Sequence, residues 1–332
     1  MIKRLTKILS ATALSLMMCA SLHAAEYEIK MAVLAPEGST WVKIMQEMDK
    51  ELQTKSGGKL ALKLYAGGVS GDEVDVIRKM RIGQLHAGAF TGVGLGKIVP
   101  AVRVLELPML FQNYQEVDSV KAKLLPQFEK DFSAKGFKIL GFAEAGFVNI
   151  YANKPIKTMA DMNGTKMWAW EGDPLVQEMY NALGITPIPL SLPDVLPALQ
   201  TKTIDGVYAP PLGMIALQWF TKTKYMTNVK LANSTGAILI TKAQYAKLPA
   251  DLQTILSETT EAYSKKLIQK IRAENTQALE SLKSNGIQVV EVDGDAKAQI
   301  TKASEAVYTK LVGKLYSQAL LDQVKGYLKA MR

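Results

Sequence analysis

Short apolar runs alternate with helical periods along this chain, most clearly in its middle third. Lys166–Trp170 has the pattern of a buried strand, and Leu175–Leu183 has the pattern of a helix. A strand over Thr186–Pro189, a helix opened by Ser191 and a strand over Ile204–Ala209 follow. Strand, helix and strand at this spacing predict βαβ units with a parallel sheet.

The N-terminal third repeats this alternation of short strands and amphipathic helices. Its expected strands are Glu28–Leu34, Leu60–Tyr65 and Ala87–Thr91. Ser39 or Thr40 is suited to cap the helix after the first strand. Ser70 with Glu73 forms a capping-box pattern for a second helix, which we expect to end near Ile82.

Other segments have weaker patterns. We expect a loop at the glycine-rich G-V-G-L-G of residues 92–96, which lacks the lysine and the spacing of phosphate-binding loops. The remaining expected elements are a crossing strand at Val102–Leu107, helices at Tyr114–Phe132 and Leu212–Lys222, and strands at Phe137–Phe142, Phe147–Ala152, Met226–Ala232 and Ala237–Thr241.

A long helical pattern at 249–285 determines the expected domain organisation. Unbroken, it would extend about 55 Å, whereas a lobe of half this chain is only about 40 Å across. The helix therefore has to run past one lobe and tie two together. We expect lobe I to hold residues 25–145 plus about 230–260, and lobe II to hold 146–229 plus about 261–332.

The first residues have the pattern of an export signal. Three basic residues precede the apolar run Ile8–Ala20, which is too short to span a membrane, and small residues follow it. We expect a signal peptide at 1–24, cleaved after Ala24 or, as second choice, after Ala25. Cys19 follows a methionine, a poor fit to a lipoprotein signal, so we expect no lipid there.

Composition excludes several function classes. Without residues 1–24 the net charge falls from +9 to +6, because that segment holds three basic and no acidic residues. The sequence shows no alternation of basic and aromatic residues, so it does not indicate nucleic-acid binding. No Cys and one His, His86, then remain. Cysteine nucleophiles and multi-histidine metal sites are therefore excluded. We interpret His86 as a core or strand-edge residue and expect no cofactor, no metal and no catalysis.

Several segments resemble one known family. They are V-L-A-P-E-G-S-T-W, G-G-x-S-G-D-E, E-L-P-M-L-F, N-K-P-I-K-T-M-A-D-M-N-G-T-K-M, P-x-P-L-S-L-P-D-V-L-P-A-L-Q-T-K-T-I-D-G and K-L-P-A-D-L-Q-T-I-L. In this order they resemble the solute-binding subunit of tripartite ATP-independent periplasmic (TRAP) transporters, the DctP-like family. The resemblance implies a two-lobed periplasmic-binding-protein architecture, crossing hinge strands, and a cleft that closes around a small-molecule ligand. It also implies a periplasmic location and delivery to small and large membrane subunits.

The chain departs from the family pattern at three recognition positions. By this resemblance, Trp168 matches the family arginine that pairs with a substrate carboxylate, and Val148 matches a second family arginine. Ala209 matches an asparagine that commonly contacts the ligand. An indole cannot replace the bidentate fork of an arginine. We therefore expect an apolar, aromatic cleft, as in family members that work with a periplasmic tetratricopeptide-repeat protein, which is a possible partner here.

The expected ligand contacts lie at strand ends or in motifs that face the cleft. They are Glu37, Trp41, Phe90, Thr91, Phe147, Val148, Trp168, Trp170, Glu171, Asp173, Tyr208 and Ala209. Glu171 and Asp173 have an alternative interpretation as caps of the helix that starts at Pro174. Two alternative functions stay open: an organic-acid-binding protein that uses other residues or a bound cation, and a binding protein that serves a signalling receptor.

Overall fold

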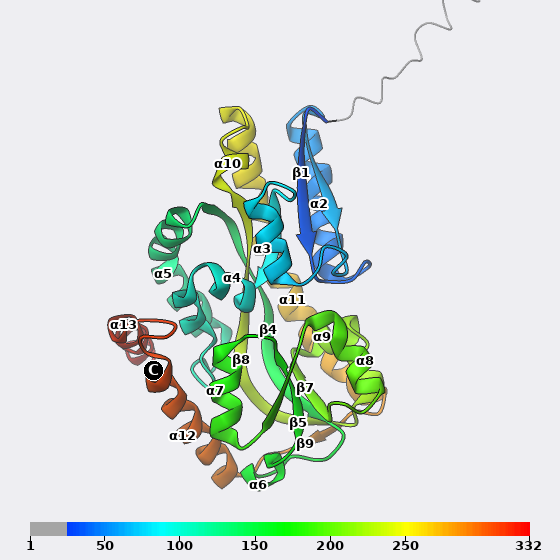
Figure 1. The fold of residues 1–332 in the computed structure, drawn as a ribbon, viewed down its shortest axis with the longest axis vertical. Helices are drawn as coiled ribbons and strands as arrows, with labels where there is room; N and C mark the ends of the chain where they lie inside the picture. Colours follow the sequence, from blue (N-terminus) through cyan, green and yellow to red (C-terminus); the bar gives the residue numbers. More distant parts are fainter. Residues whose placement is uncertain (1–24) are drawn as a thin grey trace, which may run out of the picture.

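A computed structural model describes residues 25–332, and the expected signal peptide at 1–24 lies outside them. The fold is α/β, with helices on both sides of one mixed sheet (Figure 1). Its strands are β1 (Tyr27–Val33), β2 (Leu60–Tyr65), β3 (Ala87–Thr91), β4 (Phe137–Ala152), β5 (Lys166–Trp170), β6 (Thr186–Leu190), β7 (Gly206–Ala209), β8 (Tyr225–Thr241) and β9 (Gln288–Val290).

The longer helices cover the sheet and the shorter ones connect its strands. They are α2 (Thr40–Lys55), α3 (Glu73–Arg81), α4 (Gly92–Ile98), η2 (Pro100–Glu106), α5 (Tyr114–Ala134), α6 (Met159–Met162), α7 (Pro174–Leu183), η3 (Leu192–Asp194), α8 (Val195–Gln200), α9 (Pro211–Ala216), η4 (Trp219–Lys222), α10 (Lys242–Tyr245), α11 (Ala250–Ser284), α12 (Gly294–Leu311) and α13 (Gln318–Lys329). Of the helices in residues 25–332, none is both long enough and apolar enough to cross a membrane.

Strand order divides the molecule into two lobes. The order is β2-β1-β3-β8-β4-β7-β5-β6, with β9 paired to β8. Parallel strands β1–β3 with helices α2–α4 form the first lobe, and parallel strands β5–β7 with α7–α9 form the second (Figure 1). β4 and β8 run antiparallel through both lobes. The predicted two-lobed α/β class with crossing strands is therefore confirmed.

The two crossing strands are single elements, although the sequence pattern predicted two separate strands in each. β4 has 16 residues and β8 has 17. Their ladder shifts register at Ile139/Gly141, Glu144/Gly146 and Val148/Ile150. Gly146 has a φ of +107°, which glycine tolerates without strain. Register shifts of this kind are typical of β-bulges, which bend a strand without ending it.

Helix α11 joins the two lobes along one side, as predicted. Its 35 residues extend about 52 Å at 1.5 Å per residue. It packs against α2 of the first lobe, against β4, and against α9 of the second lobe. At the C-terminus, α12 packs against α7, whereas α13 packs against α5 and η2.

Two segments near the first lobe differ from the sequence-based prediction. The glycine-rich segment is helix α4 rather than a loop, because its glycines let neighbouring side chains approach the helix backbone. A Cβ atom on Gly92 would overlap the Glu106 carboxylate, and one on Gly94 would overlap that of Glu73. The predicted crossing strand at 102–107 is instead the 3₁₀ helix η2, with Pro100 at its first turn.

Three helix boundaries also differ. Asp72 rather than Ser70 caps α3, in a capping box with Asp75. The Ser191 side chain donates to Asp194 (2.5 Å) and does not cap a backbone N–H group, so a short η3 precedes α8. The predicted helix at 212–222 is broken into α9 and η4, because Gln218 adopts a left-handed conformation with a φ of +59°.

Candidate ligand-binding site

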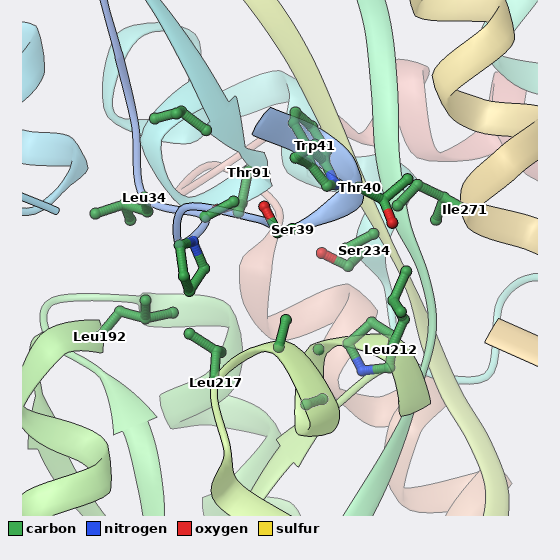
Figure 2. Close-up of a pocket in the computed structure, with 18 of the residues that line it drawn as sticks. Leu34, Ser39, Thr40, Trp41, Thr91, Leu192, Leu212, Leu217, Ser234 and Ile271 are labelled. Atoms are coloured by element: carbon green, nitrogen blue, oxygen red, sulfur yellow. The ribbon is translucent and has the colours of Figure 1, made fainter. Parts of the chain in front are cut away.

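A cavity of about 340 Å³ lies between the two lobes, at the C-terminal ends of the parallel strands. The first lobe contributes the β1–α2 loop and the end of β3, and the second lobe contributes the ends of β5 and β7. Leu34 and Ser39 approach from one side, and Leu192 and Leu217 approach from the opposite side (Figure 2). Ile271 of α11 lines the cavity from a further side, at the right of the view (Figure 2).

Aromatic rings form the wall on the side of the second lobe. The Trp168 ring stacks on Tyr208, with centroids 4.7 Å apart and planes inclined by 13°. Trp219 meets Trp168 edge-on, with a centroid distance of 5.1 Å. The indole N–H of Trp168 donates to Leu190 O (3.0 Å), and that of Trp170 donates to Asp72 Oδ2 (3.0 Å). Both N–H groups are thus engaged within the protein, and the wall offers mainly apolar surface.

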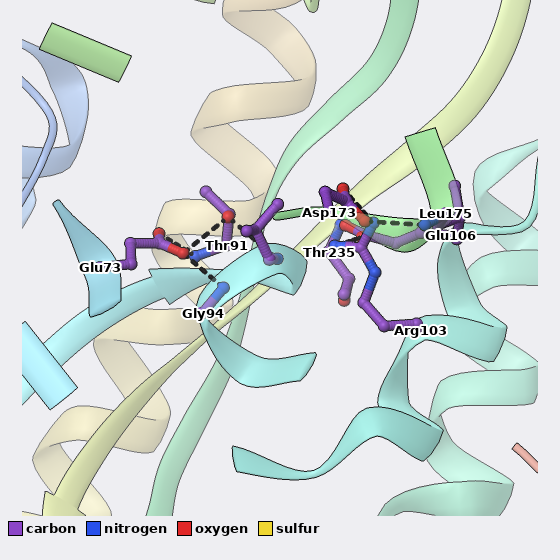
Figure 3. A network of polar contacts seen from close by, with 9 residues as sticks. Glu73, Thr91, Gly94, Arg103, Glu106, Asp173, Leu175 and Thr235 are labelled. Atoms are coloured by element: carbon purple, nitrogen blue, oxygen red, sulfur yellow. Dashed lines mark hydrogen bonds and ion pairs between the residues drawn. The ribbon is translucent and has the colours of Figure 1, made fainter. Parts of the chain in front are cut away.

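Glu73 is the only charged side chain among the described residues that line this cavity. Its Oε1 atom accepts from Thr91 N (2.6 Å), and its Oε2 atom accepts from Gly94 N (2.6 Å) and Thr91 Oγ1 (3.0 Å) (Figure 3). Burial raises the pKa of Glu73 to about 8, although the two backbone donors favour the charged form. Through its hydrogen bonds to Thr91 and Gly94, the Glu73 carboxyl group holds the end of β3 and the start of α4 in place.

Behind this wall lies a second, smaller cavity of about 70 Å³, which we call the inner chamber. Arg103 of η2 pairs there with Asp173 Oδ2 (2.7 Å) and with Glu106 Oε2 (2.8 Å) (Figure 3). Burial raises the pKa of Glu106 to about 7, while the Arg103 charge opposes that shift. Asp173 also caps α7 by accepting from Leu175 N (3.0 Å).

Most of the residues predicted from the sequence lie on the main cavity wall. They are Trp41, Phe90, Thr91, Val148, Trp168, Trp170, Tyr208 and Ala209. Their contact with a ligand stays a prediction, and the structure supplies only their common location. Val148 and Ala209 lie close together because β4 and β7 are neighbouring antiparallel strands.

Four predicted residues do not reach this wall. Phe147 is buried against Tyr114, with ring centroids 4.8 Å apart, because its side chain alternates with that of Val148 along β4. Glu37 and Glu171 are exposed to solvent. Asp173 is buried beside Arg103 as a helix cap, which agrees with the alternative interpretation.

Sequence reasoning missed part of the cavity lining. These residues come from η3, from α9 and the residue after it, from the crossing strand β8 and from helix α11: Leu192, Leu212, Leu217, Ser234 and Ile271. None of them lies directly at the carboxyl end of a parallel strand, although α9 follows β7. The rule that ligands bind at the carboxyl ends of parallel strands, the strand-end rule, therefore could not find them. The run of apolar residues after Pro210-Pro211 was the one available signal.

His86 lies away from this site, just before β3. Its Nδ1 atom accepts from Lys30 N (3.2 Å). Burial lowers the pKa of the imidazole below its ordinary value. Its contact with the β1 backbone agrees with the strand-edge interpretation.

Two lobes joined by long strands, with a ligand-sized cavity between them, define a solute-binding protein. The chain belongs to the DctP family, described as bacterial extracellular solute-binding protein, family 7, whose family model matches residues 31–315. Members of this family bind substrates and are not enzymes, and they act in the periplasm with TRAP transporters. The resemblance noted in the sequence is therefore confirmed.

Relatives and solved structures agree with this assignment. The chain is 27% identical to a solute-binding protein of Roseobacter denitrificans, over 86% of this chain and 88% of that protein. It is 27% identical to the 2,3-diketo-L-gulonate-binding periplasmic protein of Escherichia coli, over 74% and 75% of the two chains. A TRAP periplasmic solute-binding protein of Citrobacter koseri with bound D-glucuronate has a TM-score of 0.83 at 25% identity, covering 90% of this chain and 98% of that one.

Proposed function

We propose that this TRAP solute-binding protein captures a small, mainly apolar solute and delivers it to the small and large membrane subunits of its transporter. One observation carries the proposal: no Lys or Arg occurs among the described residues that line the main cavity. An acid bound in a buried site needs a paired cation or several donors, because removing a carboxylate from water is costly. Aromatic faces instead favour apolar groups.

A second candidate, an organic acid, is favoured by the relatives. The Escherichia coli relative is named for 2,3-diketo-L-gulonate, and the Citrobacter koseri structure contains D-glucuronate. For this chain, such a ligand would need other contacts or a bound cation. The neighbouring Arg103 is engaged by two carboxylates, and Glu171 points to solvent rather than to the cavity. These placements argue for the apolar solute.

The remaining expectations belong to the same proposal. We place the mature protein in the periplasm after removal of residues 1–24. We assign residues 25–145 plus about 230–260 to lobe I, and residues 146–229 plus about 261–332 to lobe II. Parallel strands β1–β3 and β5–β7, which fall into different lobes, support this division. A periplasmic tetratricopeptide-repeat protein is a possible further partner, by analogy with family members that have an apolar cleft. Service to a signalling receptor is the alternative to transport.

Calorimetry on protein stripped of carried-over ligand tests the proposed ligand class. Succinate and D-glucuronate are each titrated without metal and again with added calcium or magnesium. We expect no binding of either acid at millimolar concentration. Tight binding without metal would contradict the apolar-solute proposal, and tight binding only with metal would support an acid held through a cation.

A further inference from the structure

The inner chamber adjoins the main cavity directly. Five residues line both spaces: Thr91, Val148, Trp170, Tyr208 and Ser234. The chamber has a volume of about 70 Å³. One water molecule needs only about 10–15 Å³. The chamber therefore has room for a group of a few heavy atoms and lies next to the main cavity.

Polar side chains that line the chamber have atoms without a protein partner. Asn233 of β8 is 1% exposed, and within residues 25–332 neither its Oδ1 nor its Nδ2 atom has a hydrogen-bond partner. The Nε atom of Arg103, which is 4% exposed, also has none among the described residues. Buried polar groups are nearly always paired. An amide that needs both a donor and an acceptor, beside a free N–H, indicates a site for a hydrogen-bonding group.

The charges around the chamber select the kind of group. Arg103 contributes one positive charge, and Asp173 and Glu106 pair with it at 2.7 Å and 2.8 Å. With both carboxylates ionised the cluster has a net charge of minus one, so no unpaired positive charge is left for an anion. Burial raises the pKa of Glu106, which reduces the negative charge but frees no cation for a carboxylate.

We propose that the inner chamber binds a neutral head group of the solute, a primary amide or a hydroxyl, through Asn233 and Arg103 Nε. The solute would then be amphipathic, with its apolar body in the main cavity and its head in the chamber. This inference rests on the proposed function. A primary amide fits best, because its carbonyl can accept from Arg103 and Asn233 while its NH₂ group donates to Asn233 Oδ1.

Three probes with one apolar body test the head-group preference: phenylpropanamide, its anionic isostere phenylpropanoate, and propylbenzene, which has no polar head. Calorimetry on the stripped mature protein should show the amide binding about tenfold or more tighter than either of the others, because it forms two or three hydrogen bonds with Asn233 and Arg103 Nε. Asn233→Leu should reduce that preference to about twofold without weakening propylbenzene binding.

Asn149→Leu is the matched control. Asn149 lies on the neighbouring strand β4 and is also buried, but its Nδ2 atom donates to Val229 O (3.0 Å) and Thr227 O (3.3 Å). It should lose thermal stability and keep the amide preference. Asn233→Leu should not lower the unfolding midpoint, since it removes an amide without a protein partner. A loss in Asn233→Leu equal to that in Asn149→Leu would show that Asn233 is a structural residue and overturn the proposal.

The binding results distinguish a failure of the head-group proposal alone from a failure of the proposed apolar ligand as well. Equal affinity for propylbenzene and the amide would overturn the head-group proposal and leave the apolar cavity intact, with the chamber holding only water. An amide preference that survives Asn233→Leu would also overturn it. Tightest binding of phenylpropanoate, or no binding by any of the three probes, would contradict both the head-group proposal and the proposed apolar ligand.

Discussion

Trp168 combines a role in the core with a position on the cavity wall. Its side chain is only 2% exposed, and it packs between Tyr208 and Trp219. The main-chain carbonyl of Trp168 also accepts from Tyr180 Oη (2.9 Å). The family resemblance implies that this indole replaces an arginine of the family, which stays a prediction. The sequence does not predict that the Trp168 indole N–H donates a hydrogen bond to the Leu190 carbonyl, because that contact depends on the register between β5 and β6.

Trp168→Ala should therefore affect both binding and stability. Loss of a buried aromatic side chain costs about 3–5 kcal/mol of unfolding free energy, and we expect the native solute to bind about tenfold more weakly. Trp168→Arg should not improve binding, because it places a charge among aromatic rings. Trp168→Phe keeps a ring and serves as the control, with a smaller loss on both counts. Denaturant unfolding and calorimetry measure the two effects, and unchanged solute affinity in Trp168→Ala would contradict the cavity assignment.

Glu73 gives stability a defined pH dependence. Its folded-state pKa of about 8 lies above its ordinary value of 4.5, so the folded protein holds this proton more tightly than the unfolded chain does. The stabilisation is complete below the ordinary value and is lost as pH rises through the folded value. The unfolding free energy should thus fall between about pH 5 and pH 8, by up to a few kcal/mol.

Glu73→Gln removes this titration and should flatten the dependence, while the smaller contribution of Glu106 remains. Denaturant unfolding of both proteins at several pH values provides the comparison. Curves of equal slope for the wild type and the variant would show that Glu73 is already ionised in the folded protein.

At the scale of elements, α11 holds two cavity-lining segments together. Asn275 of this helix donates to Ala145 O of β4 (2.9 Å), and its Oδ1 accepts from Leu212 N at the start of α9 (2.9 Å). Both Ala145 and Leu212 line the main cavity. Gly146 makes this approach possible, because a Cβ atom there would meet the Asn275 amide at 2.5 Å. A bulge in β4 and a buried asparagine in α11 thus set the shape of the site.

Asn275→Ala should loosen α9 against α11. It removes the partner of the Leu212 N–H and of the Ala145 carbonyl, both half-buried, and an unsatisfied polar group costs up to about 1–3 kcal/mol when it is fully buried. We expect the unfolding free energy to fall by about 2 kcal/mol or more and solute affinity to fall several-fold. Thr276→Ala, at the next and exposed position of the same helix, is the control and should leave both quantities unchanged. Loss of stability with unaltered affinity would restrict Asn275 to a structural role.

The elements themselves were largely predictable from hydrophobic periodicity, and the path of the chain between them was not. Periodicity gave α11 and β5 because each has an uninterrupted pattern. It divided β4 into two strands, because a bulge at Gly146 looks like a turn in the sequence. The strand-end rule found Trp168 and Tyr208, but not Ile271, since α11 reaches the cavity only through the packing of both lobes.

At the scale of the whole molecule, polar contacts join the lobes at the edge of the cavity. Asp72 Oδ2 at the start of α3 accepts from Trp170 Nε1 (3.0 Å) and from Leu192 N (3.2 Å). Lys97 Nζ of α4 donates to Gly172 O (2.8 Å). With the Arg103–Asp173 pair, these contacts hold the end of β5, the residues after it and the start of η3 against the first lobe, as expected for the lobes closed upon each other.

Ligand should therefore reduce the overall size of the protein, and Asp72→Asn should oppose that change. The asparagine still caps α3 through its oxygen, but its NH₂ group cannot accept from Trp170 and Leu192. Small-angle scattering should show a smaller radius of gyration for the solute-bound wild type than for stripped protein. The variant should bind more weakly and close less completely, whereas Asp194→Asn, an exposed change near the same edge, should behave like the wild type. An equal radius with and without confirmed ligand would contradict hinge closure.

The most direct test of the central claim is to identify the solute that the protein itself selects. Protein exported into the periplasm of its host is purified without added ligand and denatured, and the released small molecules are identified and quantified by mass spectrometry. We expect a mainly apolar molecule with a neutral polar head, released in an amount close to that of the protein. Release of a sugar acid or a dicarboxylate in that amount would contradict it.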